Sequence, residues 1–269
     1  MPELPEVETT CRGIKPFVEG QTITQIIIRQ PKLRWPIEPN LNEKLSGIKI
    51  DRVNRRAKYM MLETDIGVLM IHLGMSGSLR IVEELPVEKH DHFDICLANG
   101  KRVRFNDPRR FGSLIFNQQG QQHSLLKKLG VEPLTDDFNA NYLIDKAKGR
   151  TMAIKSFIMN NQVVVGVGNI YAQEALFLSK IHPNRAASRI SSKRIGLLVD
   201  NIKQVLAEAI TAGGSSLKDF TGADGKPGYF QQTLNVYGRN QQSCNVCETE
   251  LKQMVIGQRT TIYCYKCQK

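Results

Sequence analysis

The feature that most constrains this chain is a set of four cysteines near its C-terminal end, spaced C-x2-C-x16-C-x2-C. They are Cys244, Cys247, Cys264 and Cys267. Two thiolate pairs, each presented by a tight turn, can close a tetrahedral site around one zinc ion, and this spacing is typical of such sites. Two disulfides in a secreted protein are the alternative, but we find no signal peptide, and Cys11 and Cys96 stand alone as small hydrophobes. The spacing therefore predicts one structural zinc ion.

The remaining sequence divides into a β-rich part and a helical part. After a short helix, residues 22–117 contain β-type runs separated by turn residues, and Asn99-Gly100 is the strongest hairpin signal among them. Several short strands at close spacing imply an antiparallel sandwich or barrel. From about residue 122 the apolar spacing becomes helical, and Gly213-Gly214 marks the end of a long helix. These patterns predict an α+β chain.

A chain of 269 residues is long enough for one large domain or two modest ones, each with its own core. We expect an N-terminal antiparallel β-sandwich domain over residues 1–132, which begins with a helix. A helical domain would follow over residues 133–234, and the zinc finger over residues 235–269. No repeat or low-complexity tract interrupts this division.

The positive charge of the chain lies in its second part. The formal net charge is +11, but residues 1–100 carry 13 basic and 14 acidic side chains, whereas residues 101–269 carry 24 and 12. Such asymmetry favours a polyanionic partner, although many soluble proteins are basic without binding nucleic acid. No run approaches the roughly 20 apolar residues of a membrane span, so we expect a cytoplasmic protein with no membrane partner.

The N-terminus MPELPEVETT places a proline directly after the initiator methionine. Removal of Met1 would leave Pro2 with a free secondary amine, and an α-amino group with a pKa of about 7.7 to 8.0 is a usable nucleophile near neutral pH. Glu3 is adjacent, and Glu6 follows one helical turn later. A plain helix start, where proline and acids are also favoured, is the alternative. An apolar stripe then docks this helix on a core, namely Val7, Cys11, Ile14 and Val18.

Eight motifs occur in order along the chain: MPELPEVET, RRAKY, HLGMSGSLR, KHDH, DPRRFG, VVGVGNIYAQEALF, DGKPGYF with NVYGR, and the four-cysteine finger. Together they resemble formamidopyrimidine-DNA glycosylase, a bacterial enzyme family that removes 8-oxoguanine and ring-opened purines. The resemblance covers essentially the whole chain. It implies that residues 1–132 are the catalytic domain and that residues 133–234 are a DNA-binding domain with a helix-two-turn-helix. The implied partner of this monomer is double-stranded DNA that contains oxidised purines.

The resemblance also implies catalytic roles for four residues. Pro2 would attack C1′ of the damaged nucleotide, and Glu3 would protonate the sugar ring oxygen and shuttle protons. Lys58 would assist the β- and δ-eliminations that break the 3′ and 5′ phosphate bonds. Arg259, on the hairpin between the two cysteine pairs, would contact a phosphate. Without the resemblance, Lys58 in its basic run would be a solvated strand edge.

Because C1′ of a stacked nucleotide cannot be reached inside a duplex, such an enzyme flips the nucleotide out and fills the void. Met75, Arg109 and Phe111 match the family's void-filling residues, and their types suit a wedge. On their own, Met75 and Phe111 would more often belong to a core. The remaining DNA contacts implied by the resemblance are His90, Arg150, Lys155, Asn169 and Tyr237.

Two other functions are compatible with parts of this pattern. An enzyme of the endonuclease VIII type, which acts on oxidised pyrimidines, would keep Pro2, Glu3 and the finger. Leu4 and the DPRRFG loop favour the purine enzyme. A non-catalytic zinc-finger protein that binds DNA would result if Met1 stayed in place and blocked Pro2.

Overall fold

The computed structural model describes residues 2–121, 123–213 and 234–269. These form two compact units, one containing residues 2–121, 123–127 and 212–213, and the other residues 128–211 and 234–269. The motif DGKPGYF, Met1 and the second glycine of Gly213-Gly214 lie outside the described residues.

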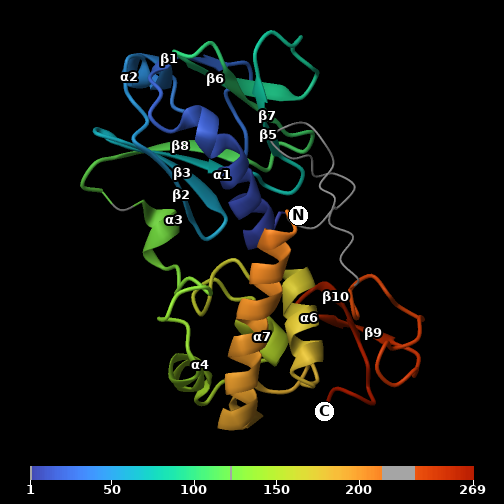
Figure 1. Ribbon diagram of the computed structural model, residues 1–269. Helices are drawn as coiled ribbons and strands as arrows, with labels where there is room; N and C mark the ends of the chain where they lie inside the picture. Colours follow the sequence, from blue (N-terminus) through green and yellow to red (C-terminus); the bar gives the residue numbers. More distant parts are fainter. Residues whose placement is uncertain (1, 122, 214–233) are drawn as a thin grey trace. The chain divides into compact units, whose positions relative to one another are not determined.

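The first unit contains two four-stranded antiparallel sheets (Figure 1). One sheet has the strand order β1-β6-β7-β5, with bounds Ile23–Ile28, Asp91–Leu97, Arg102–Asn106 and Ser78–Val82. The other has the order β2-β3-β4-β8, with bounds Arg52–Arg56, Tyr59–Thr64, Gly67–His72 and Ser113–Gln118. The predicted antiparallel sandwich is therefore confirmed, because residues of both sheets meet in one apolar core.

Helix α1, Leu4–Val18, lies against this sandwich. The predicted stripe of Val7, Cys11, Ile14 and Val18 is buried on the core. Burial, together with the charge of Glu8, raises the pKa of the Cys11 thiol to about 12. Cys11 is therefore a protonated, apolar side chain, as its place in the stripe predicts. Two short helices, α2 (Leu41–Leu45) and α3 (Ser124–Lys127), complete the unit.

The predicted turn at Asn99-Gly100 joins β6 to β7. The backbone N–H of Leu97 donates to the carbonyl of Lys101 at 2.9 Å, which closes a three-residue loop. Gly100 has φ +81°, a left-handed conformation that side chains rarely adopt. Behind this hairpin, the rings of Phe93 and Phe105 stack with centroids 4.8 Å apart in the core.

The second unit is helical, as predicted, and ends in a β-hairpin. Its helices are α4 (Ala140–Ala147), α5 (Ile154–Ile158), α6 (Asn169–Leu178) and α7 (Ser192–Thr211), with a 3-10 turn over Ala187–Arg189. Figure 1 shows α6 and α7 side by side. Residues 170–177 of α6 are all buried, because the helix packs on neighbours around its whole circumference. None of the helices in the described ranges is long and apolar enough to cross a membrane.

Strands β9 (Lys252–Ile256) and β10 (Arg259–Tyr263) form the C-terminal hairpin. A small cluster of buried residues underlies it, and this cluster includes Phe177 of α6. The finger therefore does not enclose a core by itself, since part of its apolar contact comes from the helical region.

Candidate active site and nucleic-acid interface

The N-terminal residues predicted to carry the chemistry are held at the first turn of α1. Pro2 is buried, and the carboxyl-bearing residues Glu3 and Glu6 are only 3% and 1% exposed. Glu3 and Glu6 form a capping box, in which the Glu6 carboxylate accepts a bond from the Glu3 backbone N–H at 2.8 Å. Glu3 therefore does cap the start of a helix, as the alternative interpretation predicts. The same capping box holds the backbone of Glu3, the residue that follows Pro2, in a fixed position.

Lys58 lies in the two-residue turn between β2 and β3, not on a strand as we expected. Its neighbour Ala57 has φ +53°, which a hairpin turn of this length requires. Arg55 donates to the Ala57 carbonyl at 2.9 Å and to the Glu8 carboxylate of α1 at 2.9 Å. Arg55 thus connects the turn that carries Lys58 to helix α1, whose N-cap residue is Glu3.

His72, at the end of β4, stands beside this turn. Its ring lies 4.9 Å from that of Tyr59, and its Nδ1 accepts a bond from the Gly74 backbone N–H at 2.9 Å. Burial, together with the charges of Lys58 and Arg34, lowers the pKa of His72 to about 4. At neutral pH the imidazole is therefore uncharged, so His72 adds no positive charge beside Lys58.

The three predicted void-filling residues lie on two loops that pack on each other. Met75 and Phe111 are exposed, at 37% and 43%, in spite of their apolar character. The Arg109 guanidinium lies 5.0 Å from the centre of the Phe111 ring, a cation–π distance. A Cβ on Gly74 would come within 2.5 Å of the backbone at Phe111, so only glycine allows the loops to approach this closely. Exposed apolar side chains on rigid loops fit a wedge better than a core.

Asp107 ties these loops together from a fully buried position. Its carboxylate accepts bonds from the Ser76 hydroxyl at 2.8 Å and from the backbone N–H groups of Arg109 at 3.2 Å and Gly112 at 2.8 Å. Its own N–H donates to the His90 carbonyl at 3.0 Å. The Asp107 carboxylate thus joins the loop that carries Met75 to the loop that carries Arg109 and Phe111, and we call these two the wedge loops. The backbone of Asp107 also binds His90, a predicted DNA contact.

Helix α6 organises the predicted contacts of the second unit. Asn169 is its first residue and follows Gly168. The Glu174 carboxylate accepts bonds from the backbone N–H groups of Asn235, Val236 and Tyr237 at 2.8–3.0 Å. The backbone of Tyr237 is therefore anchored to the helix that begins at Asn169.

The three basic residues predicted to contact DNA in this unit have different environments. Arg150, after α4, and Arg259, the first residue of β10, are exposed. Lys155 is 1% exposed, and its Nζ donates to the Thr261 hydroxyl at 2.6 Å. The ammonium of Lys155 therefore already has a partner within the finger.

The four cysteines of the finger converge. Their sulfur atoms all lie within 4.8 Å of one another, with Cys244 to Cys267 at 4.0 Å and Cys247 to Cys264 at 3.5 Å. A tetrahedron of thiolates with Zn–S bonds of about 2.3 Å has edges of about 3.8 Å. The donor set and its spacing therefore fit one four-coordinate zinc ion.

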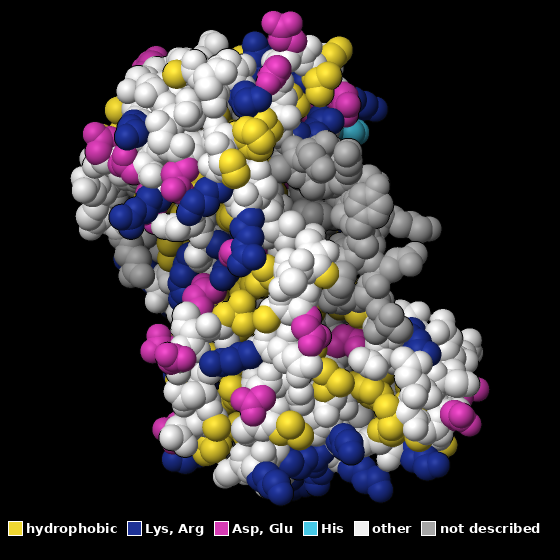
Figure 2. Space-filling model, viewed as in Figure 1, with side chains coloured by type: hydrophobic (Ala, Val, Ile, Leu, Met, Phe, Trp, Pro, Cys, Tyr) yellow, Lys and Arg dark blue, Asp and Glu magenta, His cyan; other side chains and the backbone are white. Residues whose placement is uncertain are grey.

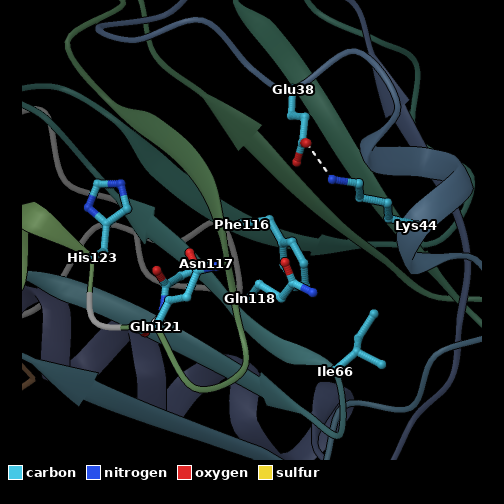
Figure 3. A pocket seen from close by; sticks show the side chains of 8 residues that line it. All are labelled: Glu38, Lys44, Ile66, Phe116, Asn117, Gln118, Gln121 and His123. Atoms are coloured by element: carbon cyan, nitrogen blue, oxygen red, sulfur yellow. Dashed lines mark hydrogen bonds and ion pairs between the residues drawn. The ribbon is translucent and has the colours of Figure 1, made fainter.

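At least two cavities occur among the described residues of the first unit. The first, of about 570 Å³, lies between α1 and β2, and its lining includes four basic side chains, namely Arg12, Lys15, Arg55 and Arg56. Figure 2 shows lysine and arginine side chains gathered over this region of the sandwich. The second, of about 460 Å³, lies by β8 and is lined by Phe116, amide side chains and a Glu38–Lys44 ion pair (Figure 3). No predicted site residue lines either cavity.

Two family models match the chain in succession. The formamidopyrimidine-DNA glycosylase N-terminal domain matches residues 1–114, and the formamidopyrimidine-DNA glycosylase H2TH domain matches residues 129–221. The chain belongs to the formamidopyrimidine-DNA glycosylase family. The resemblance inferred from the eight motifs is confirmed.

Relatives within this glycosylase family match along the full length. The formamidopyrimidine-DNA glycosylase of Hydrogenovibrio crunogenus is 57% identical, with 100% of this chain and 97% of that protein covered. The Alcanivorax borkumensis enzyme is 56% identical, with both proteins fully covered. Among solved structures, a Lactococcus lactis Fpg mutant in complex with Fapy-dG-containing DNA is similar with a TM-score of 0.92, 34% identity and full coverage of both chains. The Thermus thermophilus Fpg protein is similar with a TM-score of 0.88 and 36% identity, and the match covers 99% of this chain and 98% of that one.

Sequence reasoning about this glycosylase missed the residues that hold the predicted site in place. Asp107 opens the DPRRFG motif, and an aspartate before a proline turn is a recognisable signal for side-chain bonds to the backbone. Glu174 and Gln173 sit in the middle of a helix and have no such signal. Only the fold shows that the segments they bind, around residues 235–237 and 260–262, lie beside that helix.

Proposed function

We propose that this chain removes oxidised purines from duplex DNA and then cleaves the abasic strand. The observation that carries the proposal is the buried N-terminal turn, where Glu3 and Glu6 form a capping box at the start of α1 and the buried Pro2 directly precedes Glu3. A nucleophile at the chain terminus must be held in a defined position to react, and the hydrogen bonds of this turn hold the residue that follows Pro2. The Lactococcus lactis relative in complex with Fapy-dG-containing DNA supports the substrate class, and a second complex with abasic-site DNA supports the strand-cleaving step.

The chemistry begins once Met1 is removed and the Pro2 nitrogen is a free secondary amine. The nitrogen attacks C1′, the bond from C1′ to the damaged base breaks, and the base leaves with the proton that the Pro2 nitrogen loses. Ring opening then gives an iminium ion between Pro2 and C1′, with Glu3 donating a proton to the sugar ring oxygen. The iminium withdraws electrons, so loss of a proton from C2′ expels the 3′ phosphate, and a second elimination expels the 5′ phosphate. Lys58 assists both eliminations from its turn.

The two wedge loops support the flipping step. Met75 and Phe111 present exposed apolar surface, and Arg109 is already stacked on Phe111. These side chains would fill the space left by the extruded nucleotide, and the arginine would bond the orphaned cytosine. Asn169, Tyr237, Arg259 and Arg150 would bind phosphates from the second unit, with Lys155 and His90 as further contacts.

We infer one structural zinc ion bound by Cys244, Cys247, Cys264 and Cys267. Zinc would supply the cross-link that the small apolar cluster of the finger cannot replace. The four thiolates would hold the hairpin, and the hairpin would hold Arg259.

Borohydride trapping with an 8-oxoguanine duplex tests the function and the nucleophile together. Mass spectrometry of the trapped, digested protein should find the DNA adduct on Pro2 of chains that lack Met1. Pro2→Gly should retain some trapping through its primary amine. Equal trapping by chains that keep Met1 would refute the assignment of Pro2, and preferential trapping by an oxidised-pyrimidine duplex would refute the substrate class.

A further inference from the structure

Three side chains from the helical part of the second unit converge on one stretch of β10. Lys155 of α5, together with Asn169 and Gln173 of α6, directs nitrogen atoms at the backbone carbonyl of Thr260, at 3.5, 3.2 and 3.2 Å. This carbonyl belongs to the residue directly after Arg259. Arg259, the predicted phosphate contact, is therefore adjacent in the chain to the carbonyl that these three side chains bind.

Gln173 differs from the other two because it binds β10 on both sides of Thr261. Its Nε2 donates to the Thr260 carbonyl at 3.2 Å, and its Oε1 accepts from the Ile262 backbone N–H at 2.7 Å. Nε2 also donates to the Asn169 carbonyl at 3.0 Å. Residues two apart on a strand turn their backbone groups to the same edge. A carboxamide that both donates and accepts along that edge therefore occupies the place of a neighbouring strand.

The other features of the hairpin leave Arg259 little freedom. Strand β9 pairs with β10 on the opposite edge, with Arg259 opposite Ile256. The intervening residues Gly257 and Gln258 both have positive φ, as a tight two-residue turn requires. Lys155 reaches the same strand through the Thr261 hydroxyl, which donates to the Arg259 carbonyl at 3.1 Å. The backbone of Arg259 is thus fixed by the turn, by β9 and by the side chains of α5 and α6.

We propose that Gln173 is a positioning residue for Arg259: its carboxamide acts as a third strand along β10 and sets the hairpin from which Arg259 reaches DNA. The part that concerns DNA rests on the proposed function. Gln173 is 2% exposed and neutral, so it neither touches the phosphate nor changes the charge that attracts DNA. Any effect of its removal on salt-dependent binding must pass through a charged residue that it positions.

The test compares Gln173→Met with Gln204→Met in the full-length, zinc-loaded protein. Methionine matches glutamine in length and helix propensity but cannot form these bonds, and Gln204 lies on α7, where it binds only the exposed Glu208 among the residues described. Gln173→Met should weaken affinity for lesion DNA about tenfold and flatten its salt dependence as Arg259→Ala does. The double variant should bind no more weakly than Arg259→Ala alone. Gln204→Met should match the unmodified protein.

Additive effects of Gln173→Met and Arg259→Ala, or unchanged affinity in Gln173→Met, would overturn the proposal. Should Gln173→Met lose zinc, Gln173→Glu provides a second variant, because it keeps the acceptor for Ile262 and replaces the donor by a carboxylate oxygen. Gln204→Glu is the control for the added negative charge. Hydrogen exchange at the Ile262 amide reports the bond from Ile262 to Gln173 in the absence of DNA. If the unmodified protein failed to bind lesion DNA, the proposed function would fail. Faster exchange at Ile262 in Gln173→Met than in the unmodified protein would still support the role of the Gln173 bonds to β10. Unchanged exchange would overturn that role.

Discussion

The β-sandwich and the zinc finger hold their predicted site residues with very different amounts of apolar contact. Among the described residues, the sandwich cluster contains 24 buried side chains from strands of both sheets, α1 and the segments between them. The finger cluster contains six, of which two are cysteines and one is Phe177 of α6. Each removed apolar side chain costs about 2–5 kcal/mol in a well-packed core. The sandwich therefore has a large apolar core, whereas the finger has few apolar contacts and is bonded to α6 by polar side chains, so we expect its fold to depend on the proposed zinc ion.

Together with the proposed function, this contrast leads us to expect that residues of the sandwich carry the chemistry and that residues of the finger contribute to DNA binding. Variants in the first region should change the reaction, and variants in the second should change affinity. The following experiments test this expectation, beginning with the largest expected effect.

Glu3→Gln should reduce base excision by about 10²- to 10⁴-fold, because proton transfer by a carboxyl group contributes that much to a rate. Affinity for lesion DNA should stay nearly unchanged, since Glu3 transfers protons and does not neutralise phosphate. Single-turnover excision and equilibrium binding measure the two effects separately. Glu43→Gln, in the first turn of α2, is a matched control for loss of a helix-start acid. Parallel loss of excision and affinity would mean that Glu3 is only a structural cap.

Cys264→Ser should weaken binding of lesion DNA by about 10- to 100-fold, because a finger without zinc cannot hold Arg259. Arg259→Ala should keep one zinc ion per chain, with weaker binding and a shallower salt dependence. Zinc content and salt-dependent affinity are measured on both variants, with Cys96→Ser as the matched control outside the cluster. Full affinity in a zinc-free Cys264→Ser protein would exclude the finger from the binding surface.

Asp107→Asn should slow excision by about tenfold, because one acceptor of the carboxylate is replaced by a donor that faces backbone N–H groups. The wedge loops would loosen while the sandwich core stays intact. Affinity for undamaged duplex should not change, so the ratio of lesion to undamaged binding reports the effect. Asp65→Asn, at an exposed turn of the same unit, is the control. An unchanged excision rate would show that the wedge loops hold their shape without Asp107.

The smallest expected effect is a pH dependence of the stability of the sandwich. Burial alone would raise the pKa of Asp94, but hydrogen bonds from Arg29 and Arg104 outweigh it and lower that pKa below 3.8. A lowered pKa adds stability that is complete above pH 3.8 and is lost as the pH falls through the lowered value. Asp94→Asn should cost about 1–3 kcal/mol at pH 7.

Urea unfolding of the sandwich, followed from pH 7 to pH 3, should show this cost shrink as the pH falls below 3.8. Zinc content measured in the same samples separates acid release of the metal from unfolding of the sandwich. A constant difference between the two proteins at every pH would contradict the role of Asp94.

Much of the architecture follows from local patterns that the sequence displays directly. The stripe from Val7 to Val18 predicted a docked helix because helical periodicity is a local property, and Asn99-Gly100 predicted a turn because of its backbone preferences. The cysteine spacing likewise predicted a convergent site, since each pair is closed by a short local turn. The family itself was apparent from the order of eight motifs.

The tertiary structure decided which distant groups support those motifs. The turn at Lys58 is bonded to α1 through Arg55, the wedge loops are joined through Asp107, and β10 is clamped by Gln173, and each link spans segments far apart in the sequence. No periodicity records such a bond, because a buried carboxylate or carboxamide is defined by the atoms around it and not by its neighbours in the chain. The sequence by itself therefore determined the elements and the reactive residue types, and the packing of the sheets and of α6 determined how those residues are held.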